Sequence, residues 1–76
     1  MTIKLVKCEQ GIIYKVSKIN GNKDTILYLS NIGLSIGDSI TIISKIASIF
    51  IINIKDGRFG IDKGIATLIE VEKWEK

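Results

Sequence analysis

Side chains that can do chemistry are few in this chain, and they lie far apart along it. There is one cysteine, Cys8, and no histidine, so a serine or cysteine nucleophile would have no histidine base to activate it. Lys7 stands beside Cys8 and would lower the pKa of the thiol only a little, so we interpret Cys8 as an ordinary small residue near a strand start. Asp56 and Asp62 flank one predicted strand, but both occupy turn positions, where aspartate is common because it bonds to nearby backbone. We therefore expect a protein that is not an enzyme.

Metal and nucleotide sites also lack their usual residues. A selective site for Fe²⁺ or Zn²⁺ uses imidazoles or several thiolates, and this chain offers one thiol and no imidazole. Its seven glycines are spread along the chain and form neither a dinucleotide-binding loop nor a phosphate loop followed by lysine. We expect no metal site and no cofactor.

Length and composition indicate a single domain, residues 1–76, whose core is built mainly from strands. The chain is 46% hydrophobic, and about a quarter of its residues are isoleucine, which favours strands. Its net charge of +3 comes from scattered lysines and one arginine, whereas nucleic-acid binders usually concentrate their cations in one stripe. The N-terminus has no apolar leader, and the longest apolar run, 46–52, is far shorter than a membrane helix. We expect a soluble cytoplasmic protein without direct membrane insertion.

Strands alternate with turns along most of the sequence. A period of two residues in apolar side chains predicts strands over 12–17, 38–46, 49–55, 59–61 and 68–73. Asp56-Gly57 is typical of the type I′ turn of a hairpin, which requires positive φ at both central residues. Residues 62–67 read as a tight connection containing at most one 3₁₀ turn.

One short helix is predicted between the first two of these strands. Asp24 is the expected N-cap, and Ile26, Leu29 and Ile32 recur every three residues to form the buried side. Gly33 would end the helix in a left-handed conformation, with the next leucine folding back onto Leu29. About five short strands and one helix fit a small SH3-like barrel, which hides strand edges, better than an OB-fold, which needs longer strands.

Surface residues remain as candidates for function. Ile43, Ile49 and Ile51 fall on the side of their strands opposite the predicted core. They form an interaction face, or they are covered by other segments of the small barrel, or the predicted register of their strands is displaced by one residue. Lys55 and Arg58 flank the predicted turn and would face each other across the hairpin as a like-charge pair. Either the two cations form an anion-binding site at the tip of the hairpin, or the negative charge of Asp56 beside them reduces their repulsion.

Taken in order, the motifs resemble the FeoA family. Residues 29–37 are similar to the family's apolar helix followed by Gly-Leu-x-Pro-Gly, and 7–21 resemble its opening segment, in which a strand ends near a glycine. Residues 54–61 and 66–72 are similar to its closing hairpin and final strand. Two family prolines are replaced by Cys8 and Ile36, and the middle loop is shortened to 46–49.

The resemblance implies a cytoplasmic SH3-like barrel that acts beside FeoB, the membrane ferrous-iron transporter with a GTPase domain. Similar domains occur at the C-terminus of metal regulators of the diphtheria-toxin-repressor type, where they mediate protein contacts. The implied mechanism is regulation by docking, because a chain with so few metal ligands is not expected to handle iron itself. The helix would be the docking element, with Tyr28 on its more exposed side and Asn31 beside it. Leu29 is a further partner-binding candidate if it is partly exposed, whereas the helical period places it in the core.

Two other functions compete with this one. A small barrel that binds nucleic acid is supported by a pI near 9.1 and by Tyr14, Tyr28 and Phe59, although the scattered charges count against it. A homo-oligomeric interaction module would use Ile43, Ile49 and Ile51.

Overall fold

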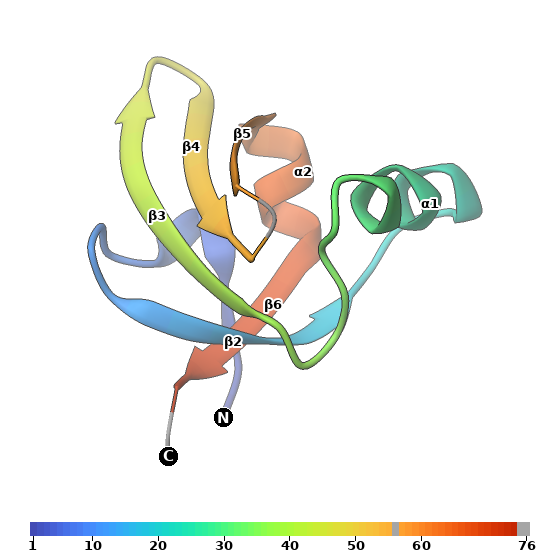
Figure 1. Ribbon diagram of the computed structural model, residues 1–76, viewed down its shortest axis with the longest axis horizontal. Helices are drawn as coiled ribbons and strands as arrows, with labels where there is room; N and C mark the ends of the chain where they lie inside the picture. Colours follow the sequence, from blue (N-terminus) through green and yellow to red (C-terminus); the bar gives the residue numbers. More distant parts are fainter. Residues whose placement is uncertain (56, 75–76) are drawn as a thin grey trace.

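The computed structural model describes residues 1–55 and 57–74 and shows a strongly curved antiparallel sheet with two helices (Figure 1). Within these residues the strands are β1 (Ile3–Lys4), β2 (Ile13–Ile19), β3 (Ser39–Ile46), β4 (Ile49–Ile54), β5 (Gly57–Asp62) and β6 (Ile69–Lys73). The helices are α1 (Lys23–Asn31) and α2 (Lys63–Leu68), and η1 (Leu5–Lys7) is a 3₁₀ turn. The strand order is β1-β6-β2-β3-β4-β5. The prediction of a mostly β, SH3-like barrel is confirmed, with six strands instead of about five because two residues near the N-terminus pair with β6.

Two bulges give the sheet part of its curvature. Ser17 is the extra residue between the pairs Val16–Val71 and Lys18–Glu70, and Ile43 is the extra residue between Ile42–Ile52 and Ser44–Ile51. A bulge bends its strand and increases the local right-handed twist, which lets a few short strands curl around one core. Ile43 therefore departs from the simple alternation that the sequence predicts for this strand.

The core follows the predicted alternation closely elsewhere. β4 contributes three side chains to one face, and the described part of the chain buries no polar or charged side chain. Every strand from β2 to β6, both helices and η1 supply apolar residues to a single cluster: Leu5, Cys8, Tyr14, Val16, Leu29, Leu34, Ile40, Ile42, Phe50, Ile52, Ile54, Ile61, Ala66, Ile69 and Val71. A small domain of this kind depends on that cluster for its stability.

The ends of α1 are set by side-chain and backbone hydrogen bonds. The predicted cap, Asp24, is wrong: Asn22 is the N-cap, and its Oδ1 accepts from the backbone N–H of Thr25 at 3.0 Å. At the other end the prediction is confirmed, because Gly33 has a φ of 94° and the N–H of Leu34 donates to the carbonyl of Leu29 at 2.9 Å.

Residues 62–67 were predicted as a tight connection, but in the structure they form the N-cap and most of a second helix, α2. Asp62 caps α2 by accepting the backbone N–H of Ile65 at 2.8 Å, and Ala66 is fully buried against the barrel. Gly64 near the start of the segment obscured the helix in the sequence, because glycine is a poor helix former. The chain thus has two helices where one was predicted.

The β4–β5 hairpin has a different register from the predicted one. Ile54 pairs with Gly57 and Asn53 pairs with Arg58, so Lys55 does not lie opposite Arg58 and the predicted like-charge pair is wrong. Gly57 has the positive φ expected of it, at 130°, while the part of the predicted type I′ turn that falls on Asp56 lies outside the described residues.

Candidate interaction surfaces

The predicted partner-binding residues fall into three groups that the fold keeps apart. Tyr28, Leu29 and Asn31 belong to α1, which projects from one side of the barrel in Figure 1. Ile43, Ile49 and Ile51 belong to the β3–β4 hairpin, which rises on the other side, and Lys55 and Arg58 lie at and beside the β4–β5 connection. They do not form one surface.

On α1 the structure separates the predicted residues into one anchor and two exposed side chains. Tyr28 and Asn31 are exposed, Tyr28 to 46%. Leu29 is fully buried, which agrees with its place in the helical period and removes it from the partner-binding candidates. Leu29 holds the helix on the barrel, and it turns the side of the helix that carries Tyr28 toward solvent.

Two further apolar side chains of α1 escaped the sequence prediction. Ile26, expected in the core, is 44% exposed, and Leu27 is 60% exposed. Together with Tyr28 they form what we call the helix surface, beside a shallow hollow of about 450 Å³ lined by Lys23, Asp24, Ile26, Leu27 and Ser30. Four consecutive apolar residues cover most of the circumference of a helix, so a helix that contacts its barrel on one side must expose some of them. That run was the signal available in the sequence.

The predicted outward isoleucines do lie on the outside of the sheet. Ile49 is 39% exposed, Ile43 and Ile51 are half-buried, and Ile46, at the tip, is 63% exposed. A β-carbon added at Gly60 would lie 3.3 Å from Ile49 Cγ2 and 3.5 Å from Ile51 Cδ1, so these two side chains close over the glycine and leave a smooth surface.

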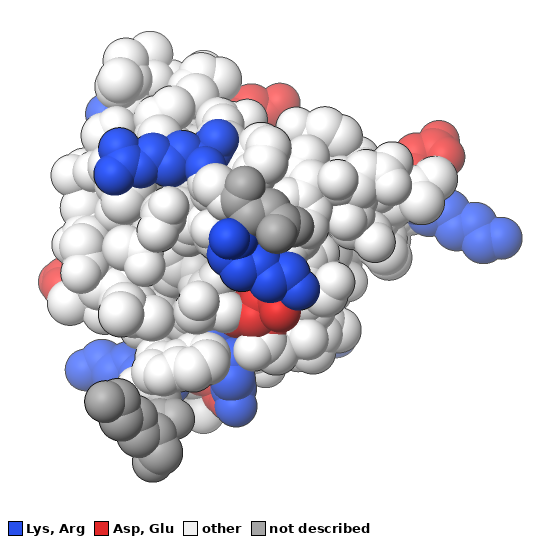
Figure 2. Space-filling view, in the orientation of Figure 1, with Lys and Arg blue, Asp and Glu red and all other residues white. Residues whose placement is uncertain are grey.

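The cations near the β4–β5 connection are dispersed. Lys55 Nζ lies 3.7 Å from Asp38 Oδ1, and both side chains are partly solvated, so the ion pair adds little stability but offsets the charge of Lys55. Figure 2 shows that the charged side chains on this face of the molecule stand singly or in small groups among uncharged ones. An electrostatic stripe suited to nucleic acid is not formed on it.

The three aromatic residues proposed for stacking do not share a surface. Tyr14 is buried, and its hydroxyl oxygen accepts from the backbone N–H of Glu9 at 3.2 Å. Phe59 is half-buried and packs against the core, whereas Tyr28 is exposed on α1. Bases stack on aromatic rings that lie open to solvent, so this arrangement does not favour nucleic acid as a ligand.

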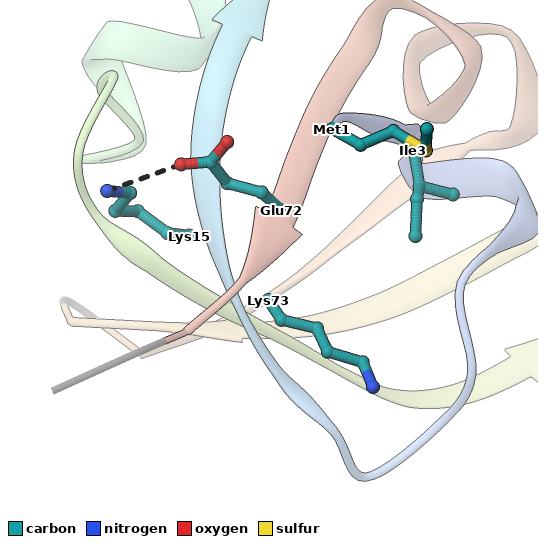
Figure 3. A pocket seen from close by; sticks show the side chains of 5 residues that line it. All are labelled: Met1, Ile3, Lys15, Glu72 and Lys73. Carbon is teal, nitrogen blue, oxygen red and sulfur yellow. Dashed lines mark ion pairs between the residues drawn. The ribbon is translucent and has the colours of Figure 1, made fainter.

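A second hollow, of about 420 Å³, lies where the N-terminus meets β2 and β6 (Figure 3). Met1 and Ile3 line one part of it, with Lys15, Glu72 and Lys73 on the other. Lys15 Nζ lies 3.4 Å from Glu72 Oε1, so that lysine is already paired. The sequence could not reveal this hollow because its residues come together only through strand pairing.

Cys8 is placed as a core residue. It is 3% exposed, and burial raises the pKa of its thiol, an effect that outweighs the opposing hydrogen bond with Tyr14 and the charge of Lys45. Its Sγ donates to the carbonyl of Lys4 at 3.5 Å. Among residues 1–55 and 57–74, no three of the Cys, Asp and Glu side chains come together in a way that could hold a metal ion.

Comparison with known proteins agrees with the fold. The architecture defines a small SH3-like barrel, and the family model of the FeoA domain matches residues 3–73. The chain belongs to the FeoA family. Membership supports a role in ferrous iron transport, and it confirms the resemblance predicted from the sequence. In the described residues, neither helix has the length and apolar character needed to cross a bilayer.

Solved structures with a similar fold come from two kinds of protein. A crystal structure of an iron uptake regulatory protein (FeoA) is 28% identical with a TM-score of 0.87, covering 97% of this chain and 99% of that one. An FeoA-like protein from Clostridium acetobutylicum is 21% identical with a TM-score of 0.85, covering 99% and 90%. A manganese-dependent transcriptional repressor is 18% identical with a TM-score of 0.88; the match covers 96% of this chain but 42% of the repressor. No curated protein sequence matches the chain.

Proposed function

We propose that this chain is a small accessory protein of ferrous iron uptake, and that it acts by docking its helix surface onto the cytosolic GTPase part of a FeoB-type transporter. The family membership and the similar FeoA structure support the iron-uptake half of this proposal. The observation that carries the docking half is the group of three exposed apolar side chains on α1, Ile26, Leu27 and Tyr28.

The helix surface has the character of a docking element. Between Asp24 and Asp38 the chain carries no charged residue, so the exposed apolar side chains of α1 lie in an uncharged stretch. An amphipathic helix that lays its apolar side into a groove of a partner is a recurring mode of recognition. Tyrosine is enriched among the residues that contribute most to such interfaces, which makes Tyr28 the expected centre.

Regulation by contact is favoured over iron handling for a chemical reason. A selective Fe²⁺ site needs several soft or imidazole ligands, and the chain supplies one thiol, Cys8, which is buried in the core. The chain would then affect transport through the conformation or assembly of its partner. Its place of action is the cytosolic side of the membrane, where the GTPase part of the partner lies.

The test measures binding of the full chain to the purified cytosolic domain of the FeoB transporter encoded by the same genome, without nucleotide, with GDP and with a non-hydrolysable GTP analogue. We expect binding in at least one state, weakened about tenfold or more by Tyr28→Ala. Ile13→Ala is the matched control, because Ile13 is 53% exposed on β2, away from α1, and its loss should change the affinity by less than twofold. If the wild-type chain binds in no nucleotide state, the proposal is wrong.

A further inference from the structure

The sheet is not closed by hydrogen bonds, because within residues 1–55 and 57–74 it ends at β1 on one side and at β5 on the other. β1 is two residues long, whereas β5 is six residues long and pairs with β4 without a bulge along its whole length. Natural proteins usually protect an edge strand with a bulge, a proline or a very short length, and β5 has none of these. The far side of β5 is therefore an open edge of the kind to which other strands pair.

Backbone groups of β5 point alternately toward β4 and away from it. Just beyond the last pair of the two strands, the N–H of Lys63 donates to the carbonyl of Ser48 at 2.8 Å. Because hydrogen-bonded and non-hydrogen-bonded pairs alternate along an antiparallel ladder, the odd-numbered residues of β5 bond to β4, and Arg58, Gly60 and Asp62 direct their N–H and C=O groups away from it. Gly60 is exposed, and since glycine has no side chain, what it exposes is backbone.

The side chains of β5 give this edge opposite charges at symmetric positions. Arg58 and Asp62 are both exposed, and each lies two residues from Gly60 on the outer side of the sheet. Oδ1 of Asp62 accepts the N–H of Ile65 as the cap of α2, and a carboxylate has a second oxygen with which it accepts from a cation. The edge thus combines main-chain donors and acceptors with one positive and one negative side chain.

We propose that β5 pairs with β5 of a second copy of this chain, antiparallel and about a two-fold axis through Gly60. In this register each Arg58 lies opposite Asp62 of the other copy, and Gly60 lies opposite its own counterpart. The three outward residues of each strand then exchange about six main-chain hydrogen bonds. On the inner side, the half-buried Phe59 comes opposite Ile61 of the other copy, an aromatic and β-branched pair of the kind that stabilises sheets.

The charges favour a second copy over an unrelated strand. An edge that accepts any strand needs no particular side chains, whereas a two-fold pairing requires each charge to meet its opposite at the symmetry-related position. Arg58 and Asp62 meet that requirement in this register alone: a register displaced in either direction forms fewer of the hydrogen bonds and no longer sets opposite charges across from each other.

Main-chain hydrogen bonds, with little buried area, hold such a dimer together. A pair of edge strands is smaller than a standard interface, so we expect a dissociation constant on the order of 0.1 mM. The exposed Arg–Asp pairs should make association weaker as salt is added. The inference is independent of the proposed function, because it uses β5 and not α1.

Amide hydrogen exchange of the full chain, followed by NMR, tests the hydrogen bonds directly. At about 20 µM the amides of Phe59 and Ile61 should be protected by their bonds to β4, while those of Arg58 and Gly60 exchange freely. At about 1 mM the exchange of Arg58 and Gly60 should slow by about threefold or more, and sedimentation equilibrium should show the average mass rising from that of a monomer toward that of a dimer. A wild-type chain that stays monomeric at 1 mM overturns the proposal, as does a Gly60 amide that exchanges equally fast at both concentrations.

Charge reversal tests the register. Arg58→Glu and Asp62→Lys each set like charges opposite one another, so each variant alone should associate about tenfold more weakly than the wild type. An equimolar mixture of the two variants restores both pairs of opposite charge and should associate as strongly as the wild type. Asp62→Asn keeps a capping side chain for α2 and removes only the charge, so it should associate more strongly with Arg58→Glu than Arg58→Glu does with itself, whether or not Asp62→Lys folds.

Lys23→Glu is the matched control, because Lys23 is exposed on α1 and the change in charge equals that of Arg58→Glu. We expect it to dimerise as the wild type does, and loss of dimerisation in this variant would overturn the proposal by assigning the contact to α1. Mixtures with Arg58→Glu that associate no better than Arg58→Glu alone also overturn it. So does protection of the Gly60 amide only when the cytosolic domain of the FeoB transporter is added, which would assign the edge to a strand of that protein.

Discussion

Leu29→Ala is the substitution that most directly tests how α1 is held in place. Leu29 is fully buried and is the one residue of the helix with that degree of burial in the described structure, while its neighbour Leu27 is 60% exposed. Both substitutions remove the same atoms from the same helix, and both change helix propensity equally, by little. Any difference between them therefore reports the contact of Leu29 with the barrel.

The expected magnitudes differ severalfold. Replacing a fully buried leucine by alanine costs about 3 kcal/mol of unfolding free energy, from lost transfer energy and the cavity left behind. Replacing a mostly exposed leucine costs less than about 0.5 kcal/mol. A chain of this size has a total stability of only about 3–5 kcal/mol, so Leu29→Ala should leave at most about 2 kcal/mol, whereas Leu27→Ala should fold normally.

Urea denaturation followed by far-ultraviolet circular dichroism measures both effects. With a slope of about 1 kcal/mol per molar urea, Leu29→Ala should lower the midpoint by about 3 M, while Leu27→Ala should move it by less than about 0.5 M. Leu29→Met conserves volume and should recover most of the loss, at a cost below about 1.5 kcal/mol. Equal midpoints for Leu29→Ala and Leu27→Ala would refute the anchoring role and, with it, the orientation of the helix surface.

Three further outcomes follow from particular contacts. The buried thiol of Cys8 should react with a thiol reagent at pH 8 only as fast as the protein unfolds. Because burial raises the pKa of this thiol, stability should fall as the pH rises above about 9, the ordinary pKa of the thiol in the unfolded chain. Hydrogen bonds from Asn20 and Thr2 hold the pKa of Glu70 below its usual range. The contribution of Glu70 to stability should therefore be present above about pH 4.5 and be lost as the pH falls through the pKa of Glu70 in the folded protein. Asn20→Ala should raise the pKa of Glu70 in a carboxyl NMR titration. Ala47 has a φ of 54° in the β3–β4 turn, so Ala47→Gly should raise the melting temperature by up to about 5 °C in calorimetry, and a lower value would contradict the strain.

The likeness to a metal-dependent repressor shows how little the fold alone says about function. The same barrel makes up most of this chain and 42% of the repressor, at 18% identity. Shared folds carry unrelated functions, so the role of each barrel depends on what its surface contacts. For this chain the informative feature is the helix surface, which does not depend on a metal ligand.

Local patterns in the sequence determined most of the fold. The alternation of isoleucines predicted the strands and their buried faces, because side chains of a strand point to opposite sides in turn. Gly33 predicted the end of α1, because the left-handed conformation there favours glycine, and the structure gives it a φ of 94°. The absence of histidine, a property of the sequence alone, already limits the chemistry of the chain.

Only the tertiary structure decided which apolar residues are exposed and which are buried. Ile26, Leu27 and Leu29 are equally apolar in the sequence, but α1 contacts the barrel along a narrow stripe, so Leu29 alone is buried. The register of β4 with β5 likewise separated Lys55 from Arg58: the sequence identified a hairpin, and the pairing of its two strands decided which residues lie opposite each other. Sequence periodicity identifies the side of an element that can be buried, and the packing of its neighbours determines how much of that side remains as a binding surface.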